Sequence, residues 1–269
     1  MNDHMSHPSH GHTNKDVKTA YFDCFSGASG DMILGAMLDA GLQLDDLKKE
    51  LDKLHLSHFD LDAEKVTKRG IGGTRARVNI DQDYHDHHHR GLADILGILE
   101  KSDLETDIRD KCASIFKRIA EAEARVHRQP IEAVHFHEVG AMDSIIDVVG
   151  AVAGLTILGV QAIFCSPLHV GTGTVRCAHG IIPVPAPATA ELIKGFPAYT
   201  TDVSGELLTP TGAAILTTLS SGFGPIPMMT VESIGYGAGK ADPDIPNLLR
   251  IWICQKENQK DKEQTRLLH

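Results

Sequence analysis

A long apolar stripe between residues 103 and 127 is the feature that most constrains how this chain can fold. Apolar side chains recur there at intervals of four, four, three, four, three and four residues, the spacing of a single face of an α-helix. They are Leu104, Ile108, Cys112, Ile115, Ile119, Ala122 and Val126. Ser102 and Glu105 form a capping-box pattern at its start, and Pro130 predicts its end. A helix with one long apolar face needs other elements to bury that face.

Shorter helices and strands are predicted to alternate along the rest of the chain. Helices are expected at 31–40, 46–54, 92–101 and 138–158, and a further helix opens at Thr209-Pro210. Strands are expected at 21–25, 162–165, 228–234 and 248–254, with two more between residues 58 and 80 around a glycine-rich turn. Residues 166–188 predict little regular structure. The fold class is therefore α+β, an irregular α/β arrangement with interleaved helices and short strands.

The chain is expected to form one folded region between two polar ends. Residues 1–17 lack apolar periodicity and predict a disordered, His-rich tail. Residues 18–254 hold the predicted elements, with a His-rich loop near 81–91. Residues 255–269 are charged and polar and predict a second tail.

Charge and cysteine usage limit the classes of partner. The formal net charge of −10 favours cations and disfavours nucleic-acid phosphate and anionic membrane, so we expect neither nucleic acid nor membrane as a partner. The longest apolar run, 145–160, is interrupted by Asp147 and is shorter than the about 20 residues of a membrane span. The five cysteines form no C-x-x-C pair, and the N-terminus carries no signal-peptide core. These features predict a cytoplasmic protein.

Histidine is unusually frequent and unevenly placed. Of the 16 histidines, four lie close together in the predicted loop: His85, His87, His88 and His89. Imidazole suits nickel, zinc and copper, and a flexible segment can wrap several rings around one ion, so the tract is a candidate metal site. A solvated loop with adventitious metal affinity explains the tract equally well. The histidines among the first twelve residues favour that second interpretation.

A second candidate site begins where a predicted extended segment enters a helix. His135 and His137 point to the same side of an extended chain, because side chains alternate along it. Glu138 follows at the predicted start of the helix. These three residues are candidate metal ligands.

The helix that follows carries two carboxylates on an otherwise apolar sequence. Asp143 and Asp147 are four residues apart and share one face with Gly150 and Gly154. A buried carboxylate requires a cation, a hydrogen-bond network or a ligand, which favours a functional role for both aspartates. Pairing with an Arg or Lys from elsewhere in the chain is the structural alternative.

Glycine-rich loops supply further candidates. Ser26, Gly27, Ser29 and Gly30 lie between a predicted strand and a helix that opens with Asp31, an arrangement that can present amides to an anion. The loop lacks the G-K-[ST] ending of a Walker loop, and its glycines also suit ordinary tight turns.

The loop 165–188 contains two more histidines, and two further glycine-lined turns are predicted downstream. His169 and His179 could line a pocket or be satisfied surface residues. The turns are predicted at 210–212 and 235–239, and the second could approach a phosphate or be a plain hairpin.

Six stretches together resemble a known family. They read FDCFSGASGDMILGAMLDAGL (22–42), VHFHEVGAMDSIIDVVGA (134–151), SPLHVGTGTV (166–175), HGIIPVPAPATAEL (179–192), GELLTPTGAA (205–214) and GYGAGKADPDIPNLLR (235–250). They resemble the nickel-insertion proteins of lactate racemase maturation, the LarC family, over residues 18 to 254.

The resemblance implies a chelatase of the lyase class. Members insert nickel into pyridinium-3,5-bisthiocarboxylic acid mononucleotide, in a reaction that consumes CTP and is assisted by Mn²⁺ or Mg²⁺, and the product serves lactate racemase. The histidines would collect the metal, and carboxylates and histidines would relay it and accept the proton lost from the pyridinium carbon. Asp31, Asp143 and Asp147 are therefore the expected catalytic residues, and the loop 26–30 with His179 is expected to hold the substrate phosphate.

The resemblance also implies a partner region. Family proteins carry a C-terminal domain associated with CTP binding, so we expect this chain to need such a domain or polypeptide. Two other functions stay open. A nickel store or chaperone would need only the His tract, and a phosphoryl-transfer enzyme would use Asp23 and Asp31 around magnesium.

Overall fold

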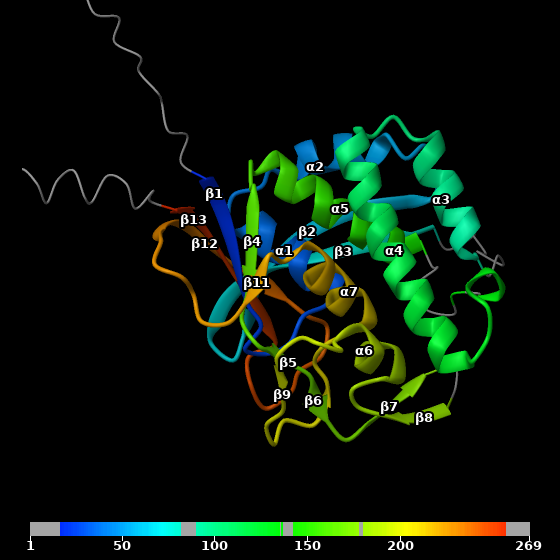
Figure 1. Cartoon of the computed structure of the whole chain (residues 1–269). Helices are drawn as coiled ribbons and strands as arrows, with labels where there is room; N and C mark the ends of the chain where they lie inside the picture. The colour runs from blue at the N-terminus through cyan, green and yellow to red at the C-terminus, as the bar shows by residue number, and fades with distance from the viewer. Residues whose placement is uncertain (1–16, 82–89, 135, 137–141, 178–179, 257–269) are drawn as a thin grey trace, which may run out of the picture.

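The computed structural model describes residues 17–81, 90–134, 136, 142–177 and 180–256. Figure 1 shows a sheet flanked by helices, and the prediction of an α+β fold is confirmed. Most of the two predicted tails and of the predicted His-rich loop lies outside the described residues. The predicted tail boundaries are wrong at Val17, which begins a strand, and at Gln255 and Lys256, which end one, because these residues pair in the sheet. Within the described part of the chain, no helix is long and apolar enough to cross a membrane.

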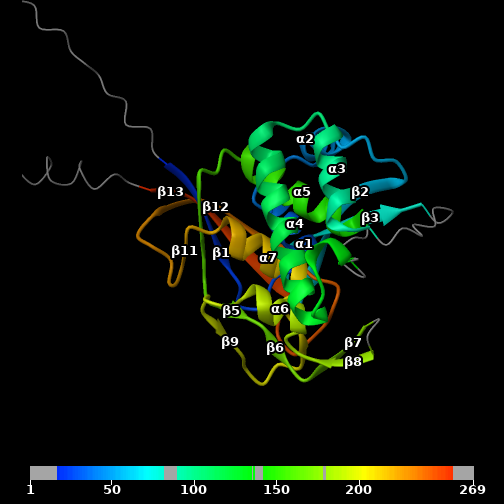
Figure 2. The same ribbon diagram turned by 45° about the vertical axis from the view of Figure 1, so that its right-hand side comes forward.

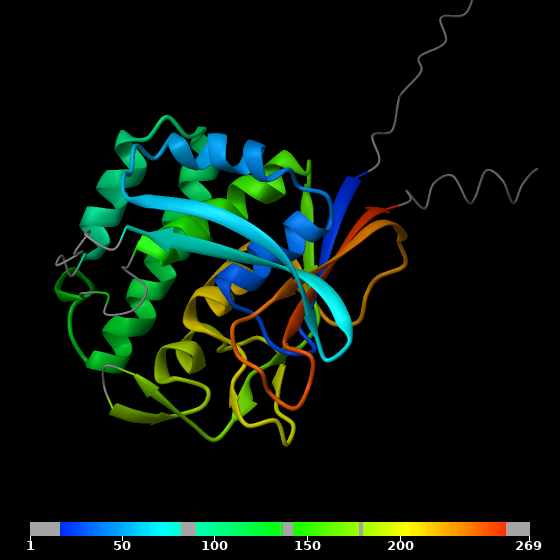
Figure 3. The same ribbon diagram turned by 180° about the vertical axis from the view of Figure 1, so that it is seen from behind.

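A mixed sheet of seven strands forms the base of the fold. Its strand order is β11-β4-β1-β13-β12-β3-β2. The strands are β1 (Val17–Asp23), β2 (Phe59–Lys68), β3 (Ile71–Ile80), β4 (Ala162–Cys165), β11 (Gly222–Phe223), β12 (Thr230–Ala238) and β13 (Leu248–Lys256). β13 is antiparallel to both β1 and β12, whereas β4 is parallel to β1. Figure 3 shows the long β2–β3 hairpin crossing the back of the molecule.

Helices cover the sheet in layers. They are α1 (Gly30–Asp39), α2 (Leu44–Asp52), α3 (Leu92–Lys101), α4 (Thr106–His127), α5 (Met142–Ile157), α6 (Pro187–Leu192) and α7 (Pro210–Leu219). α1 packs directly on β3, β12 and β13, α5 packs on α1, and α4 packs over α5, α6 and α7. Figure 2 shows α4 on the outer side of this group. The apolar stripe of α4 is therefore buried from Ile108 to Ala122, as its spacing predicts.

The predicted capping box at Ser102 is wrong. Ser102 instead ends α3, and α4 begins at Thr106 after Glu105. The Asp103 amide donates to the carbonyl of Lys53 at the end of α2 (3.0 Å), which holds the intervening residues as a link between helices. A tertiary hydrogen bond thus overrides the local pattern.

Among the described residues of 166–186, the regular structure consists of short strands, and α6 begins at Pro187. The strands are β5 (Leu168–His169), β6 (Gly171–Thr172), β7 (Thr174–Cys177) and β8 (Gly180–Pro183). A short 3-10 helix, η1 (Ile131–Ala133), and two further strands, β9 (Ala198–Tyr199) and β10 (Gly205–Glu206), complete the described elements. β5 pairs with β9 and β6 pairs with β10, so this region folds as a set of small ribbons below the main sheet (Figure 1).

The glycines at 235–239 do not form the predicted turn, because Gly235 and Gly237 lie inside β12. A Cβ on Gly237 would stand 1.7 Å from the carbonyl oxygen of Met32, and one on Gly235 would stand 2.1 Å from that of Ala36. These glycines therefore let α1 lie directly on the sheet.

Candidate functional site

The beginnings of three helices meet at one cleft. Its volume is about 520 Å³, within the range of about 300–1,000 Å³ usual for small-molecule sites. The start of α1 contributes Ser29 and Gly30 to its lining, and the first turns of α5 contribute Asp143 and Asp147. The start of α7 contributes Thr209 and Thr211. The other lining residues are Asp31, Met32, Ala76, Arg77, Val78, Asn79, Ser144, Glu206, Leu207, Pro210, Gly239, Lys240, Ala241 and Asn247.

The cleft brings together all three predicted catalytic aspartates. Asp31 lies in the first turn of α1, and Asp143 and Asp147 come from one face of α5, as their four-residue spacing predicts. Asp31 Oδ1 accepts hydrogen bonds from the Ser29 hydroxyl and from the Met32 amide (3.0 Å). Asp143 Oδ1 accepts one from the Ser144 amide (2.8 Å). These bonds hold both carboxylates at the starts of their helices, where the helix dipole favours negative charge.

Asp147 has a different environment. Its Oδ1 is buried and has no hydrogen-bond partner among the described residues. Burial raises its pKa well above the ordinary value, and the nearby charges of Asp31 and Asp143 raise it further, while Lys240 acts in the opposite direction. An unsatisfied buried carboxyl with a raised pKa in a cleft is typical of a group that exchanges a proton or meets a ligand.

Gly30 makes room for this carboxyl. A Cβ at position 30 would stand 2.2 Å from Asp147 Oδ2 and 2.5 Å from its Cβ, so no other residue fits without displacing the aspartate. The glycine that ends the loop 26–30 therefore has a specific packing role at the cleft.

The rest of the loop 26–30 is turned away from the cleft. Ser26 is fully buried, and neither Ser26 nor Gly27 lines the cleft. Gly27 has a φ of +78°, and a Cβ there would stand 2.0 Å from the carbonyl oxygen of Leu207. The Ala28 amide also donates to that oxygen (3.0 Å). This half of the loop therefore packs against the segment before α7, while Ser29 and Gly30 face the cleft.

Most of the predicted metal ligands lie outside the described residues. These are His85, His87, His88, His89, His135, His137 and Glu138, together with His179 of the predicted phosphate site. Their roles stay predictions. His137 and Glu138 directly precede, in sequence, the segment that leads into α5 and its two aspartates.

His169 is a satisfied core residue. It is 2% exposed, and its Nδ1 lies 2.7 Å from the Phe25 carbonyl oxygen. Its Nε2 lies 3.0 Å from the Thr201 hydroxyl, and its ring stacks on Tyr199 with centroids 4.6 Å apart. Both ring nitrogens are therefore engaged within the protein, which favours the structural interpretation of this histidine.

Asp23 and Asp31 do not share a site. Asp23 is hydrogen-bonded to the guanidinium of Arg250 and does not line the cleft. The arrangement of two aspartates around magnesium, which the phosphoryl-transfer alternative requires, is absent from the described residues.

Several cleft residues were not foreseen. Lys240, Asn247, Arg77 and Thr209 line the cleft but come from distant parts of the sequence. The stretch GYGAGKADPDIPNLLR contains two of them, and its run of glycines before a lysine was the available signal.

Comparison with known proteins agrees on one family. The model of the nickel insertion protein family matches residues 20–269. A pyridinium-3,5-bisthiocarboxylic acid mononucleotide nickel insertion protein from Desulfitobacterium hafniense is 50% identical over 248 residues, which cover 92% of this chain and 61% of that protein. A protein of the same description from Acetivibrio thermocellus is 47% identical, covering 92% of this chain and 62% of its own length.

A putative nickel insertion protein from Dictyoglomus thermophilum is 47% identical over 252 residues, covering 94% of this chain and 64% of that protein. The chain thus spans less than two thirds of the length of these relatives. No solved structure matches it.

Proposed function

The chain belongs to the nickel insertion protein family, and from that membership we propose that its cleft binds pyridinium-3,5-bisthiocarboxylic acid mononucleotide and promotes the insertion of nickel into it. The observation that carries the proposal is Asp147, a buried carboxyl without a partner among the described residues, beside two further aspartates in a cleft of suitable size. Nickel is the cargo of this reaction.

The chemistry requires a base. A C–H bond breaks at the pyridinium carbon between the two thiocarboxylates, its electron pair forms the bond to Ni²⁺, and the proton leaves. No electron is gained or lost. We assign the proton to Asp147, because the causes that raise its pKa also make its carboxylate a stronger base than an ordinary aspartate.

The neighbouring carboxylates attract the incoming cation. Asp31 and Asp143 lie at the cleft, and their negative charges stabilise Ni²⁺ as it approaches the ring. A divalent cation there also favours the ionised form of Asp147, so arrival of nickel prepares the base. His135, His137 and Glu138 are proposed to pass nickel to the cleft from the His tract at 85–89, since imidazole binds nickel readily.

The proposal also includes CTP and a second metal ion. We propose that the reaction consumes CTP, that a C-terminal region like that of the longer relatives takes part, and that the product is delivered to lactate racemase. Among the described residues, no three Asp, Glu, His or Cys side chains are grouped closely enough to hold a metal ion. We propose that Mn²⁺ or Mg²⁺ acts together with CTP, whose phosphates supply ligands to such an ion, and no step above depends on either ion.

The test is a nickel-insertion assay with the pyridinium nucleotide, Ni²⁺ and CTP, followed by the absorbance and mass of the product. It compares this chain alone with this chain plus the C-terminal region of the Desulfitobacterium relative. We expect little insertion by the chain alone, recovery on addition of that region, and loss of recovery in an Asp147→Asn variant. Full recovery with the Asn variant would remove Asp147 from the mechanism, and no insertion in any mixture would refute the proposed function.

A further inference from the structure

Lys240 is a cation at the cleft without a structural partner. Two basic residues line the described cleft, Arg77 and Lys240. Arg77 is paired with Glu64 across the β2–β3 hairpin. Lys240 makes no hydrogen bond or ion pair with any described residue, although its charge acts on Asp147. An exposed lysine that no acid holds is free to bind an anion at this wall of the cleft.

The backbone that carries Lys240 is held firmly, unlike that of an ordinary surface lysine. The Gly239 amide donates to the Asn247 carbonyl oxygen (3.1 Å), and the Asn247 side-chain amide donates to the Ala241 carbonyl oxygen (3.0 Å). Lys68, a residue that is only 7% exposed, donates from its ammonium group to the same Ala241 oxygen (2.8 Å).

A second anchor comes from the hairpin tip. The Arg69 guanidinium donates two hydrogen bonds to the Pro243 carbonyl oxygen (3.0 and 2.8 Å). Figure 3 shows this tip beside the loop between β12 and β13. The main chain on both sides of Lys240 is therefore fixed, which reduces the main-chain entropy lost when Lys240 binds a ligand.

Acidic residues outnumber basic residues in the described lining of the cleft. Asp31, Asp143 and Asp147 gather where α1 meets α5, and a phosphate placed among them would be repelled. The start of α7 has no acidic residue in its first turn and contributes Thr209 and Thr211 to the cleft wall. Glu206, three residues before Thr209, is a fourth carboxylate in the lining. The positive end of that helix and the ammonium of Lys240 are the features of the described lining that favour an anion.

We propose that Lys240 binds the phosphate of a pyridinium mononucleotide and thereby orients its ring toward the carboxylates. This inference rests on the proposed function for the identity of the nucleotide. A chain with a net charge of −10 repels phosphate overall, so a local, unpaired cation is what such a ligand requires. A phosphate dianion is a stronger partner for an ammonium group than a neutral acceptor. Lys240 is a positioning residue, since in this proposal it contacts the phosphate and not the reacting carbon.

The experiment measures binding without nickel, by calorimetry of the whole chain. Nicotinamide mononucleotide is the probe, because it carries a pyridinium ring and a phosphate, and nicotinamide riboside is the same molecule without the phosphate. We expect the wild type to prefer the mononucleotide, and Lys240→Ala to lose about tenfold or more of that preference while riboside affinity stays unchanged. Lys240→Arg should retain most of it.

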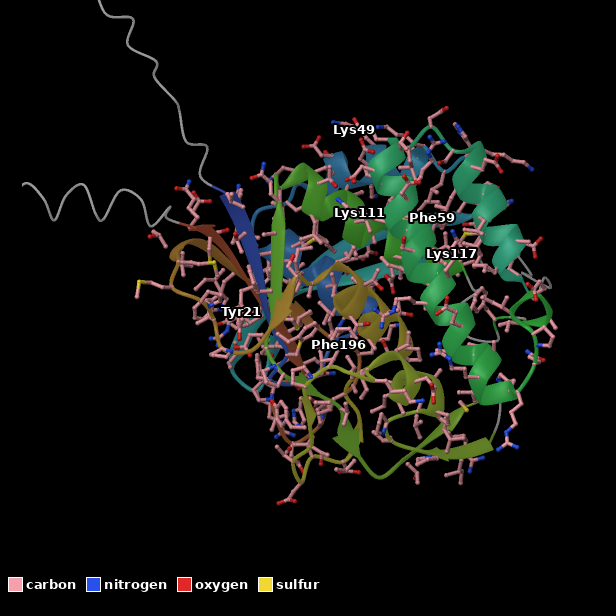
Figure 4. The ribbon with its side chains drawn as sticks, viewed as in Figure 1. Tyr21, Lys49, Phe59, Lys111, Lys117 and Phe196 are labelled. Carbon is pink, nitrogen blue, oxygen red and sulfur yellow. The ribbon has the colours of Figure 1, made fainter. Side chains whose placement is uncertain are left out.

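Lys117→Ala is the matched control, since Lys117 is an exposed lysine on α4 that does not line the cleft (Figure 4). An unchanged preference in Lys240→Ala overturns the proposal, as does the absence of any preference in the wild type. Binding of CMP that depends on Lys240, without such binding of nicotinamide mononucleotide, overturns the assignment to a pyridinium nucleotide. If the preference for the mononucleotide depends on Lys240 but the protein inserts no nickel, the phosphate site is supported and the proposed nickel insertion is rejected.

Discussion

Gly30 at the start of α1 and Asp147 on α5 fit against each other so closely that a Cβ on the glycine would stand 2.2 Å from Asp147 Oδ2. The contact joins two helices that begin more than a hundred residues apart in sequence, and it sets where the buried carboxyl lies in the cleft. Position 30 therefore controls the site although it supplies no reactive group.

Gly30→Ala should lower the rate of nickel insertion strongly and the stability of the fold only moderately. Alanine suits a helix, but its methyl group must push the Asp147 side chain aside, which we expect to cost about 1–3 kcal/mol of unfolding free energy. Nickel insertion in the reconstituted assay should fall by more than tenfold. Chemical denaturation and the insertion rate measure the two effects.

Gly97→Ala is the control for that change. Gly97 lies in α3, and a Cβ there would meet nothing within 4 Å, so the substitution should leave insertion unchanged and stabilise the protein by about 0.5–1 kcal/mol. Equal insertion by the Gly30→Ala variant and the wild type would show that the position of Asp147 does not matter.

Asp147→Asn should change how stability depends on pH. The pKa of Asp147 in the folded protein is raised well above 3.8, the value expected when the chain is unfolded. Between those two values the folded state keeps a proton that the unfolded state has released, so this group makes stability fall as pH rises through the window. Asparagine does not titrate and removes that contribution.

Urea denaturation at a series of pH values measures the effect. The free energy of unfolding of the wild type should fall relative to that of the Asn variant as pH rises from about 4, and the difference should level off above the raised pKa. Two curves that stay parallel over the whole range would mean that Asp147 ionises normally in the folded protein.

Sequence patterns within single segments predicted the buried face of a helix and the shared position of two carboxylates. The spacing of α4 gave its buried face, and the four-residue interval between Asp143 and Asp147 gave two carboxylates on one side of α5. Both are local properties, since helical geometry alone decides which residues share a face.

Contacts between segments that are far apart in the sequence could not be predicted from patterns within one segment. The glycines of β12 resemble a turn in sequence, but they are needed because α1 lies on the strand, a fact that concerns residues about 200 positions apart. Lys240 was missed for the same reason, because its position at the cleft depends on anchors from Lys68 and Asn247. His169 could be weighed either way until its two hydrogen-bond partners were known.

The His tract should load nickel in a manner that depends on pH. Ni²⁺ competes with protons for imidazole nitrogen, so affinity should fall as pH drops through the imidazole range of about 6.5. Calorimetric titration of the whole chain with Ni²⁺ at several pH values measures this. Equal uptake by a variant with His85, His87, His88 and His89 all replaced by Ala would remove the tract from the account.

The tract and the cleft should act on different steps. Asp143→Ala or His137→Ala is expected to abolish insertion while leaving most nickel binding intact, because Asp143 lines the cleft where we propose the reaction and the His tract is proposed to supply the metal. Excising residues 85–89 should do the reverse: insertion becomes slow at low nickel and returns to normal when nickel is in excess. A nickel store would behave differently, since loss of the tract would end its only function at every nickel concentration.

The measurement that separates these cases is the insertion rate as a function of nickel concentration. It is made for a cleft variant, for the variant without residues 85–89, and for the two changes combined. Normal insertion by correctly folded Asp143→Ala and His137→Ala variants would place the reacting centre elsewhere. If the base and the cation site lie at the start of α5, both variants should lose insertion, and excess nickel should not restore it.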